Sequence, residues 1–270
     1  MPPAPAMTDI TSPQNPRVKH IVKLREDKRQ RQKDGLLLVE GWDEIQLAIS
    51  AGHRPRTLLT APELASRPLT FPSAETEVEP VETLTVSRAA FEKMSYRDNP
   101  DGWLAVFPIP QTTLAGLNVS DVPLVIVAES IEKPGNLGAI LRTADAAGVD
   151  ALLLCDPRVD PWNPNVIRAS RGTVFSVPVV ECGNASALAW LRAHRIRVLA
   201  ATPSAQTTYS DVDMTRPTAI AVGTEDEGLT DFWMNNADVQ VKIPMQGKVN
   251  SLNVSVSTAL IVYEAVRQRK

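Results

Sequence analysis

Short apolar segments that alternate with helical patterns fill the sequence after Pro123, and this alternation constrains the fold more than any other feature. The first segment, 124–128, reads LVIVA and is typical of a strand buried on both faces of a sheet. A helical pattern over 137–147 follows it and ends at Gly148. Because strands that alternate with helices form a parallel sheet covered on both faces, the sequence predicts an α/β domain here.

The same alternation continues to the end of the chain. Further strands are expected at 151–155, 198–201, 219–222 and 239–243, and further helices at 185–194 and 252–267. Ligands of a parallel sheet bind beyond the carboxyl ends of its strands. We therefore expect the functional residues in the loops that follow Ala128, Ala201, Val222 and Ile243.

The first part of the chain has a pattern of its own, which predicts a smaller α/β domain. Strands are expected at 36–39, 84–86 and 104–107, and a helix at 42–51. Turn residues and weak periodicity over 109–122 are typical of a linker. The predicted organisation is an N-terminal domain over 1–108, this linker, and a C-terminal domain over 123–270.

Composition excludes several other classes of protein. With 43% hydrophobic and 22% charged residues, the chain reads as globular rather than disordered or fibrous. No apolar run approaches the roughly 20 residues that span a bilayer, and the first residues do not resemble a signal peptide, so a cytoplasmic protein is expected. Cys155 and Cys182 are too few for a disulfide framework and lack metal-ligand spacing, so buried free thiols and no metal site are expected.

The charge is distributed unevenly although the net charge is only −3. Between Arg17 and Lys33 there are eight basic residues and two acidic ones. The basic residues are Arg17, Lys19, Lys23, Arg25, Lys28, Arg29, Arg31 and Lys33. Such a segment can bind phosphates, or it can be a solvated helix face that docks on its own domain through Ile21, Val22 and Leu24; both interpretations stay open.

Two loops of the C-terminal half carry polar residues that suit a binding site. Asn136 follows a Pro-Gly turn and is a good N-cap residue, able to present its amide to a ligand or to the backbone. Arg142 lies on the next helix among core-facing residues, where a specific partner or a salt bridge is expected. Glu225 is held between Gly223 and Gly228, where it can pair with Arg142, hold a cationic ligand, or be an exposed loop acid.

A third loop, 243–255, is the most specific of the three. A strand is expected to end at Ile243, and Ser251, Asn253 and Ser255 fall in the first turn of the predicted last helix. Helix capping needs one such residue, so three of them indicate a polar pocket as well. No loop carries the glycine fingerprint of a nicotinamide- or nucleotide-binding enzyme, which disfavours that class.

In this order and at these separations, the three loops resemble the signature motifs of the SpoU (TrmH-type) RNA ribose 2′-O-methyltransferases of the SPOUT class. The similarity covers about 122–267. The motifs read Asn136-x-Gly138-x-Ile140-x-Arg142-Thr143, then Gly223-x-Glu225-x-x-Gly228-Leu229, then Ile243-Pro-Met245 with Ser251-Leu-Asn-Val-Ser255. This sequence departs from the family pattern at Thr224, where asparagine is common, and fills a variable slot with Gly135.

Other segments resemble parts of the same family. Asn15-Pro-Arg-Val-Lys19 and Leu38-Val-Glu-Gly41 are similar to the RNA-binding domain, itself similar to certain ribosomal proteins, that precedes the catalytic domain in many members. The segment Arg168-Ala-Ser-Arg-Gly172, followed by Val174-Phe-Ser-Val-Pro178, resembles the thiostrepton- and avilamycin-resistance branch. Whether the protein confers resistance or performs housekeeping modification stays open.

The resemblance implies a C-terminal domain tied in a deep trefoil knot, which binds S-adenosylmethionine in a bent form and completes its site as a homodimer. Backbone groups that contact the cofactor are carried over to Gly223, Ile243 and Leu252. Side chains that line the same pocket are carried over to Thr202, Glu225, Met245 and Asn253. RNA-binding residues are expected among Arg17, Lys19, Lys23, Arg25, Lys28, Arg29, Arg31, Arg168 and Arg171.

The resemblance also implies catalytic roles. Arg142 is expected either to activate the ribose 2′-hydroxyl or to position an RNA phosphate, since arginine is a poor base at its usual pKa. Asn136 is expected to orient Arg142 or the ribose. Glu225, Ser251 and Asn253 are expected to hold cofactor and nucleotide. No metal is needed for methyl transfer of this kind.

The predicted function is therefore S-adenosylmethionine-dependent methylation of a ribose 2′-hydroxyl, with 23S ribosomal RNA as the expected substrate. Three alternatives stay open: a transfer RNA 2′-O-methyltransferase, a base-methylating relative, and a non-catalytic RNA-binding or ribosome-assembly factor of the same fold.

Overall fold

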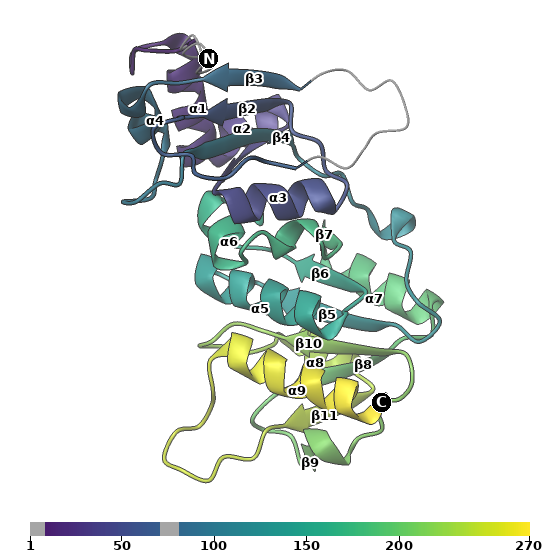
Figure 1. Ribbon diagram of the computed structural model, residues 1–270. Helices are drawn as coiled ribbons and strands as arrows, with labels where there is room; N and C mark the ends of the chain where they lie inside the picture. The colour runs from purple at the N-terminus through teal and green to yellow at the C-terminus, as the bar shows by residue number, and fades with distance from the viewer. Residues whose placement is uncertain (1–8, 71–80) are drawn as a thin grey trace. The chain divides into compact units, whose positions relative to one another are not determined.

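The computed structural model describes residues 9–70 and 81–270 (Figure 1). Contacts divide the described chain into two units. The first unit holds the chain up to Pro110 together with Trp162–Ser176, and the second holds Gln111–Pro161 and Val177–Lys270. The sequence had placed residues 162–176 in the C-terminal domain. They belong to the first unit because Phe175 packs against the rings of His53 and Phe107 there.

The first unit is built on a four-stranded sheet of order β1-β4-β2-β3, in which β4 is antiparallel to β1 and β2. Its strands are β1 (Leu36–Glu40), β2 (Thr57–Thr60), β3 (Glu82–Thr85) and β4 (Trp103–Pro108). Its helices are α1 (Pro16–Glu26), α2 (Lys28–Asp34), α3 (Trp42–Ser50), α4 (Arg88–Met94), α6 (Pro164–Ala169) and the 3₁₀ turn η2 (Thr173–Phe175). Strand β2 was not predicted, because its four residues are too short for a clear period.

The basic segment forms two helices rather than one. Asp27 ends α1 and caps α2, since its side chain accepts a hydrogen bond from the Arg29 amide. Ile21 and Leu24 are buried against the domain, as predicted, together with Val18, while Val22 is half-buried. The docked-helix interpretation of this segment is therefore confirmed for its apolar face.

The second unit contains a seven-stranded sheet of order β7-β6-β5-β10-β8-β11-β9, and every neighbouring pair is parallel. Its strands are β5 (Leu124–Glu129), β6 (Ala151–Cys155), β7 (Val179–Cys182), β8 (Arg197–Ala201), β9 (Thr207–Thr208), β10 (Thr218–Val222) and β11 (Val239–Lys242). Its helices are α5 (Pro134–Ala147), α7 (Asn184–Ala193), α8 (Asp231–Asn236) and α9 (Val254–Gln268), with short turns η1 (Leu114–Gly116) and η3 (Tyr209–Asp211). The predicted parallel α/β domain is confirmed.

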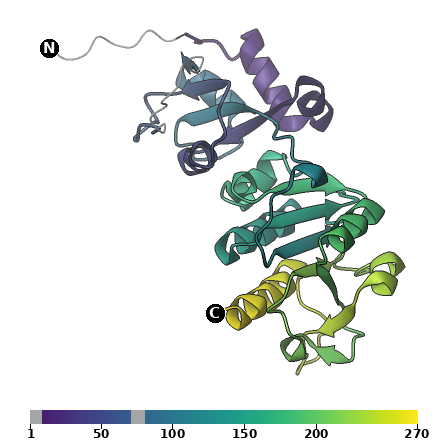
Figure 2. The same cartoon turned by 90° about the vertical axis from the view of Figure 1, so that its right-hand side faces the viewer.

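Helices cover both faces of this sheet, which explains its apolar strands (Figure 2). On one face, Trp190 of α7 and Trp233 of α8 pack on a core that includes Val125 and Val127 of β5. Helices α5 and α9 pack on each other, and α9 contacts β10 on the other face. Because β10 lies between β5 and β8, the loops after β5, β8, β10 and β11 leave neighbouring positions of one sheet edge.

Two further expectations concern thiols and membranes. Cys155 is buried and Cys182 half-buried; both are free, with their sulfur atoms 4.0 Å apart on neighbouring strands. Within 9–70 and 81–270, no helix is both long and apolar enough to cross a bilayer.

Candidate functional site

The loop after β10 is a tight turn that holds Glu225 at the edge of the sheet. The Thr224 amide donates to the Gly228 carbonyl at 3.0 Å, and the Gly228 amide donates back to the Thr224 carbonyl at 3.1 Å. Gly228 has a φ of 72°, which favours glycine. A Cβ atom on Gly223 would lie 2.0 Å from the Gly228 carbonyl oxygen. Both glycines are therefore required by the turn that places Glu225.

Glu225 is the point at which the three loops meet. Its carboxylate accepts hydrogen bonds from the amide of Asn136 at 2.7 Å and from the amide of Asn253 at 2.6 Å. It also forms an ion pair with Lys133. Lys133, and after it Asn136, lower the pKa of the Glu225 carboxyl below its usual value, so the group is ionised at neutral pH.

The structure corrects two expectations about α5. Glu225 forms its ion pair with Lys133, the N-cap residue of α5, and not with Arg142, which lies further along that helix. Asn136 is not the N-cap residue; it lies in the first turn, which leaves its amide available to Glu225. Arg142 is exposed, and its side chain makes no hydrogen bond or ion pair with any described residue. Its guanidinium is therefore available to a ligand.

The start of α9 also differs from the prediction. The helix begins at Val254, so Ser251 and Leu252 precede it instead of lying in its first turn. Asn253 is the N-cap: its side-chain oxygen accepts from the Ser255 amide at 3.0 Å and from the Ser255 hydroxyl at 2.6 Å. The other end of the same side chain donates to Glu225. Asn253 thus ties the start of the last helix to the loop after β10.

A cavity of about 580 Å³ opens beside Glu225, within the usual range for small-molecule sites. Six of the seven residues expected to bind the cofactor line it: Thr202, Gly223, Glu225, Ile243, Met245 and Leu252. Ser251 lines it too, whereas the seventh, Asn253, reaches it through its hydrogen bond to Glu225. The cavity has an apolar wall and polar groups at its loops, which suits a ligand with both characters.

A smaller cavity of about 120 Å³ adjoins the first. Lys133 and Asn136 line only the smaller cavity, whereas Glu225 lines both. Arg158 also lines the smaller cavity and forms an ion pair with Glu132. Glu225 therefore places a negative charge between two neighbouring spaces.

Glu129, at the end of β5, is a structural residue of this site that the sequence analysis missed. It is 1% exposed, and its carboxylate accepts from the Asn184 amide at 2.7 Å and from both the backbone amide and the hydroxyl of Thr230 at 2.8 Å. Asn184 in turn accepts from the Trp233 indole at 2.7 Å. Glu129 thus anchors the residue that follows the Glu225 loop. The available signal was an acidic residue at the end of an otherwise apolar strand.

In the first unit, three of the predicted RNA-binding arginines have partners in the protein, although Arg17 remains exposed. Arg31 is 2% exposed, and its guanidinium donates to the Leu24 carbonyl at 2.8 Å. Arg25 donates to the Ser95 carbonyl at 2.5 Å. Arg17 pairs with Glu82 at 2.6 Å. The expectation that Arg31 binds RNA is wrong for this structure, because a phosphate has no access to a buried guanidinium.

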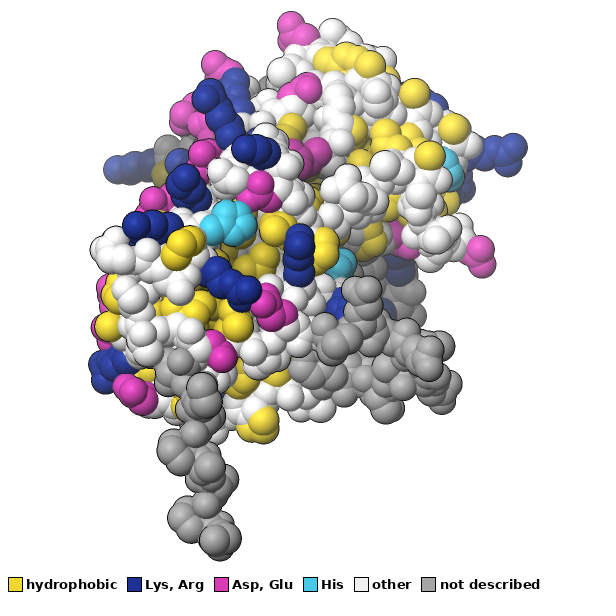
Figure 3. Space-filling view, turned by 90° about the horizontal axis from the view of Figure 1, so that it is seen from above, with side chains coloured by type: hydrophobic (Ala, Val, Ile, Leu, Met, Phe, Trp, Pro, Cys, Tyr) yellow, Lys and Arg dark blue, Asp and Glu magenta, His cyan; other side chains and the backbone are white. Residues whose placement is uncertain are grey.

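The other predicted RNA-binding residues are accessible. Lys19, Lys23, Lys28 and Arg29 are exposed and form no ion pair with any residue in the described part of the chain. Arg168 and Arg171 are exposed as well. In the space-filling view, basic side chains stand among acidic and hydrophobic ones, not in one continuous stripe (Figure 3).

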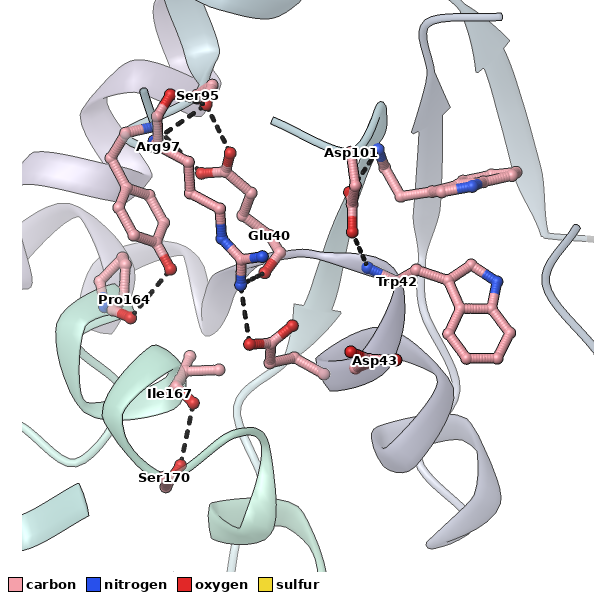
Figure 4. Close-up of polar contacts among 12 residues, drawn as sticks. Glu40, Trp42, Asp43, Ser95, Arg97, Asp101, Pro164, Ile167 and Ser170 are labelled. Carbon is pink, nitrogen blue, oxygen red and sulfur yellow. Dashed lines mark hydrogen bonds and ion pairs between the residues drawn. The ribbon is translucent and has the colours of Figure 1, made fainter. Parts of the chain in front are cut away.

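A buried polar network explains the Leu38–Gly41 motif (Figure 4). Arg97 donates to the Glu40 carbonyl at 2.8 Å and to the Glu44 carboxylate at 2.7 Å. The Glu40 carboxylate accepts from the Tyr96 amide at 3.0 Å. The Tyr96 hydroxyl donates to the Pro164 carbonyl at 3.2 Å, and burial raises the pKa of Tyr96 to about 12. The motif therefore organises the first unit and holds α6 on it.

Two family models match this chain in its two halves. Residues 123–263 match the SpoU rRNA Methylase family, and residues 15–105 match the MRM3-like substrate binding domain. The first match contains every loop of the site described above, and the second contains the basic helices.

Individual relatives match almost end to end. The chain is 30% identical to 23S rRNA (guanosine(2553)-2′-O)-methyltransferase RlmP of Bacillus subtilis (strain 168), over 95% of this chain and 98% of the relative. It is 31% identical to the 23S rRNA (uridine(2479)-2′-O)-methyltransferase of Streptomyces viridochromogenes, over 98% and 94%. The crystal structure of the SpoU methyltransferase AviRb from Streptomyces viridochromogenes in complex with AdoMet superposes with a TM-score of 0.83 at 29% identity, over 94% of this chain and 99% of that chain.

Proposed function

Because this chain belongs to the SpoU rRNA methylase family, we propose that it transfers a methyl group to a ribose 2′-hydroxyl of 23S ribosomal RNA. It is an S-adenosylmethionine-dependent RNA methyltransferase with the α/β-knot fold of its class, preceded by a smaller substrate-binding domain. The observation that carries the proposal is the meeting of three loops at Glu225, beside a cavity of about 580 Å³.

The residues around this cavity fit S-adenosylmethionine. Ile243, Met245 and Leu252 offer apolar surface for an adenine ring, and Gly223 leaves space at the turn where any side chain would collide with the backbone. Thr202 and the backbone of the three loops offer hydrogen-bond partners for the polar parts. When bound, the cofactor supplies a sulfonium-activated methyl group.

Arg142 is the residue we assign to the RNA side of the reaction. Its exposed guanidinium has no partner among the described residues, so it can hold an RNA phosphate or stabilise the 2′-oxygen as the hydroxyl loses its proton. Asn136, six residues earlier on α5, is held by Glu225 and lines the smaller cavity. We place the ribose there, so that alignment of donor and acceptor supplies most of the rate enhancement.

The proposed functional form is a homodimer assembled through the second unit. On α9, Val256, Leu260 and Tyr263 are 47%, 38% and 47% exposed. Their spacing of four and three residues places them on one face of the helix. An exposed apolar stripe of this kind marks an interaction surface, and a second copy of the chain is the partner that we propose for it.

A comparison of ribosomal RNA from cells with and without the protein tests the proposal. Primer extension at low nucleotide concentration should show one stop in 23S RNA that depends on the protein, and nuclease digestion with mass spectrometry should place the methyl group on ribose. A methylated base would favour the base-methylating alternative, and a new mark only in transfer RNA would favour that substrate. Unchanged RNA modification with altered ribosome assembly would favour the non-catalytic alternative.

Two further parts of the proposal concern the cell. We place the enzyme in the cytoplasm, where its proposed substrate is assembled. Protection of the ribosome against an antibiotic, which the similarity of 168–178 suggests, is tested by the drug susceptibility of the same pair of strains.

A further inference from the structure

The first unit contains a cleft of about 420 Å³ that has no role in the methyl-transfer site of the second unit. It lies between α1 and the sheet, and each of the four strands of that sheet supplies at least one residue that lines it. Its floor is apolar and includes Ile21, Leu36, Leu84 and Val106. The volume exceeds what a water molecule or an ion needs and lies within the range of sites for small organic groups.

Charged side chains surround this apolar floor in two opposed pairs. Arg17 of α1 pairs with Glu82 of β3 at 2.6 Å, and His20 of α1 contacts Asp34 at 2.7 Å. The Thr57 hydroxyl also donates to Glu82, at 3.1 Å. Arg17 lowers the pKa of the Glu82 carboxyl, so the group remains an ionised hydrogen-bond acceptor at neutral pH.

One further guanidinium at the rim, that of Arg56, forms no hydrogen bond or ion pair within the described residues. Arg56 lines the cleft next to Thr57 and is exposed; its backbone amide donates to the Val106 carbonyl, whereas its guanidinium forms no hydrogen bond or ion pair with residues 9–70 or 81–270. The exposed Lys19 and Lys23 lie on α1, the helix that forms one wall. Arg56, Lys19 and Lys23 can therefore hold RNA phosphates beside the cleft, whereas the carboxylates within the cleft would repel a phosphate.

This combination fits a nucleobase better than a phosphate or a metal ion. Guanidinium planes and an imidazole ring are the surfaces on which unstacked bases stack in RNA recognition. Carboxylates accept hydrogen bonds from the exocyclic amino groups of bases. A phosphate would meet the repulsion of Glu82 and Asp34, and a metal ion would meet the repulsion of Arg17 and Arg56.

We propose that this cleft binds one unpaired base of the RNA substrate that carries an exocyclic amino group, with Glu82 as its acceptor. The inference rests on the proposed function in one respect, that the substrate is RNA. It assigns a base-reading task to the first unit, which complements ribose methylation by the second.

Binding of the full-length protein to single-stranded RNA tests the inference. The probes are fluorescent oligo(rC) and oligo(rU) of about eight nucleotides, because cytosine has an amino group where uracil has a carbonyl oxygen. Fluorescence anisotropy should show about tenfold tighter binding of oligo(rC). Equal affinities for the two oligonucleotides would overturn the proposal.

Glu82→Gln separates base reading from simple charge attraction. If Glu82 accepts from the base, the substitution lowers affinity for oligo(rC) and removes the preference for it. If the cleft is only part of a phosphate-binding surface, loss of a negative charge raises affinity for both oligonucleotides, which would contradict the proposal. Glu92→Gln is a matched control, since Glu92 forms a comparably exposed ion pair with Arg88 outside the cleft.

Arg56→Ala provides a second variant that does not disturb an ion pair. The substitution should weaken binding of both oligonucleotides by a similar factor. An unchanged affinity would show that Arg56 is not part of the site. Failure of this inference and failure of the proposed function are distinguishable. A protein that methylates 23S RNA but binds both oligonucleotides equally lacks the base site, whereas one with the preference but no methyl transfer lacks the proposed activity.

Discussion

The side-chain amide of Asn253 lies 2.6 Å from a carboxylate oxygen of Glu225, although the two residues are 28 positions apart and belong to different loops. Asn253 also caps the last helix. The hydrogen bond therefore couples the start of α9 to the turn after β10, and both border the cavity assigned to the methyl donor. Asn136, from the loop after β5, completes the junction.

Arg142→Ala should abolish methyl transfer and leave cofactor affinity within about twofold. The guanidinium has no partner in the described protein, so its removal costs little stability, whereas loss of a group that stabilises the reacting oxygen typically lowers kcat by about 100- to 1,000-fold. A tritiated-methyl assay and calorimetric titration with S-adenosylmethionine measure the two effects. Arg142→Lys is the control that retains the charge. If Arg142→Ala turned over as fast as the unmodified protein, the assignment of Arg142 would be refuted.

Glu129→Gln should destabilise the second unit and weaken cofactor binding. Both oxygens of the Glu129 carboxylate now accept hydrogen bonds, one from the Thr230 backbone amide and the other from Asn184 and the Thr230 hydroxyl. A glutamine would replace one of these oxygens with an NH₂ group that faces a donor. A buried donor without an acceptor costs about 1–3 kcal/mol. Urea unfolding measures this loss, and KM for S-adenosylmethionine should rise more than kcat falls. Glu132→Gln, an exposed acid of the following loop, should change neither quantity much.

Stability below neutral pH should depend on Glu264. Arg267, and after it Gln268, lower the pKa of this carboxyl from 4.5 to about 2. Because the folded pKa is depressed, the contribution to stability is present above the unfolded value and is lost as pH falls from 4.5 toward 2. Glu264→Gln should therefore lower Tm at pH 7 more than at pH 2.5. An equal decrease at both pH values would show that the carboxylate contributes no pH-dependent stability.

Leu260→Glu should convert the proposed dimer into monomers. Leu260 is the middle residue of the exposed stripe on α9, and a carboxylate there would be desolvated in the interface. Light scattering after size exclusion measures the mass, and methyl transfer should fall with the loss of dimer. Val122→Glu changes an exposed apolar side chain that is not part of this stripe and should leave the mass unchanged, although the Val122 carbonyl accepts from Arg269 at the end of α9. A monomeric mass for the unmodified protein would count against the proposed assembly.

Replacement of Lys19, Lys23, Lys28 and Arg29 by alanine should weaken RNA binding and reduce its salt dependence. Each phosphate contact contributes about 0.7 to the slope of log affinity against log salt for a single strand. Filter binding at several salt concentrations measures that slope, and an unchanged slope would restore the solvated-helix interpretation. Arg31→Ala should behave differently and lower Tm, because its buried guanidinium satisfies the Leu24 carbonyl.

Local sequence patterns predicted the parts of this molecule whose structure depends on residues near one another in the sequence. Alternating apolar strands and helices were sufficient for the parallel sheet, and loop position was sufficient to bring Asn136, Glu225 and Asn253 to one edge. The pairing of Lys133 with Glu225 was not predictable in this way, because it depends on which loop end lies nearest in space.

Contacts between residues distant in sequence also explain two larger differences between the prediction and the structure. Residues 162–176 fold onto the first unit through Phe175 and Tyr96, which are partners distant in sequence. Arg31 is part of a basic run, and only the path of α2 shows that its guanidinium turns inward. Charge periodicity marks a basic segment but does not tell which of its members are buried.

The most direct test of the central claim uses purified protein, S-adenosylmethionine with a labelled methyl group, and 23S ribosomal RNA from cells that lack the protein. Complete digestion to nucleosides followed by mass spectrometry identifies the product. The account predicts a single 2′-O-methylated nucleoside that is absent when Arg142→Ala replaces the unmodified protein. A methyl group on a base, or no labelled nucleoside with a protein that binds both S-adenosylmethionine and the RNA, would contradict it.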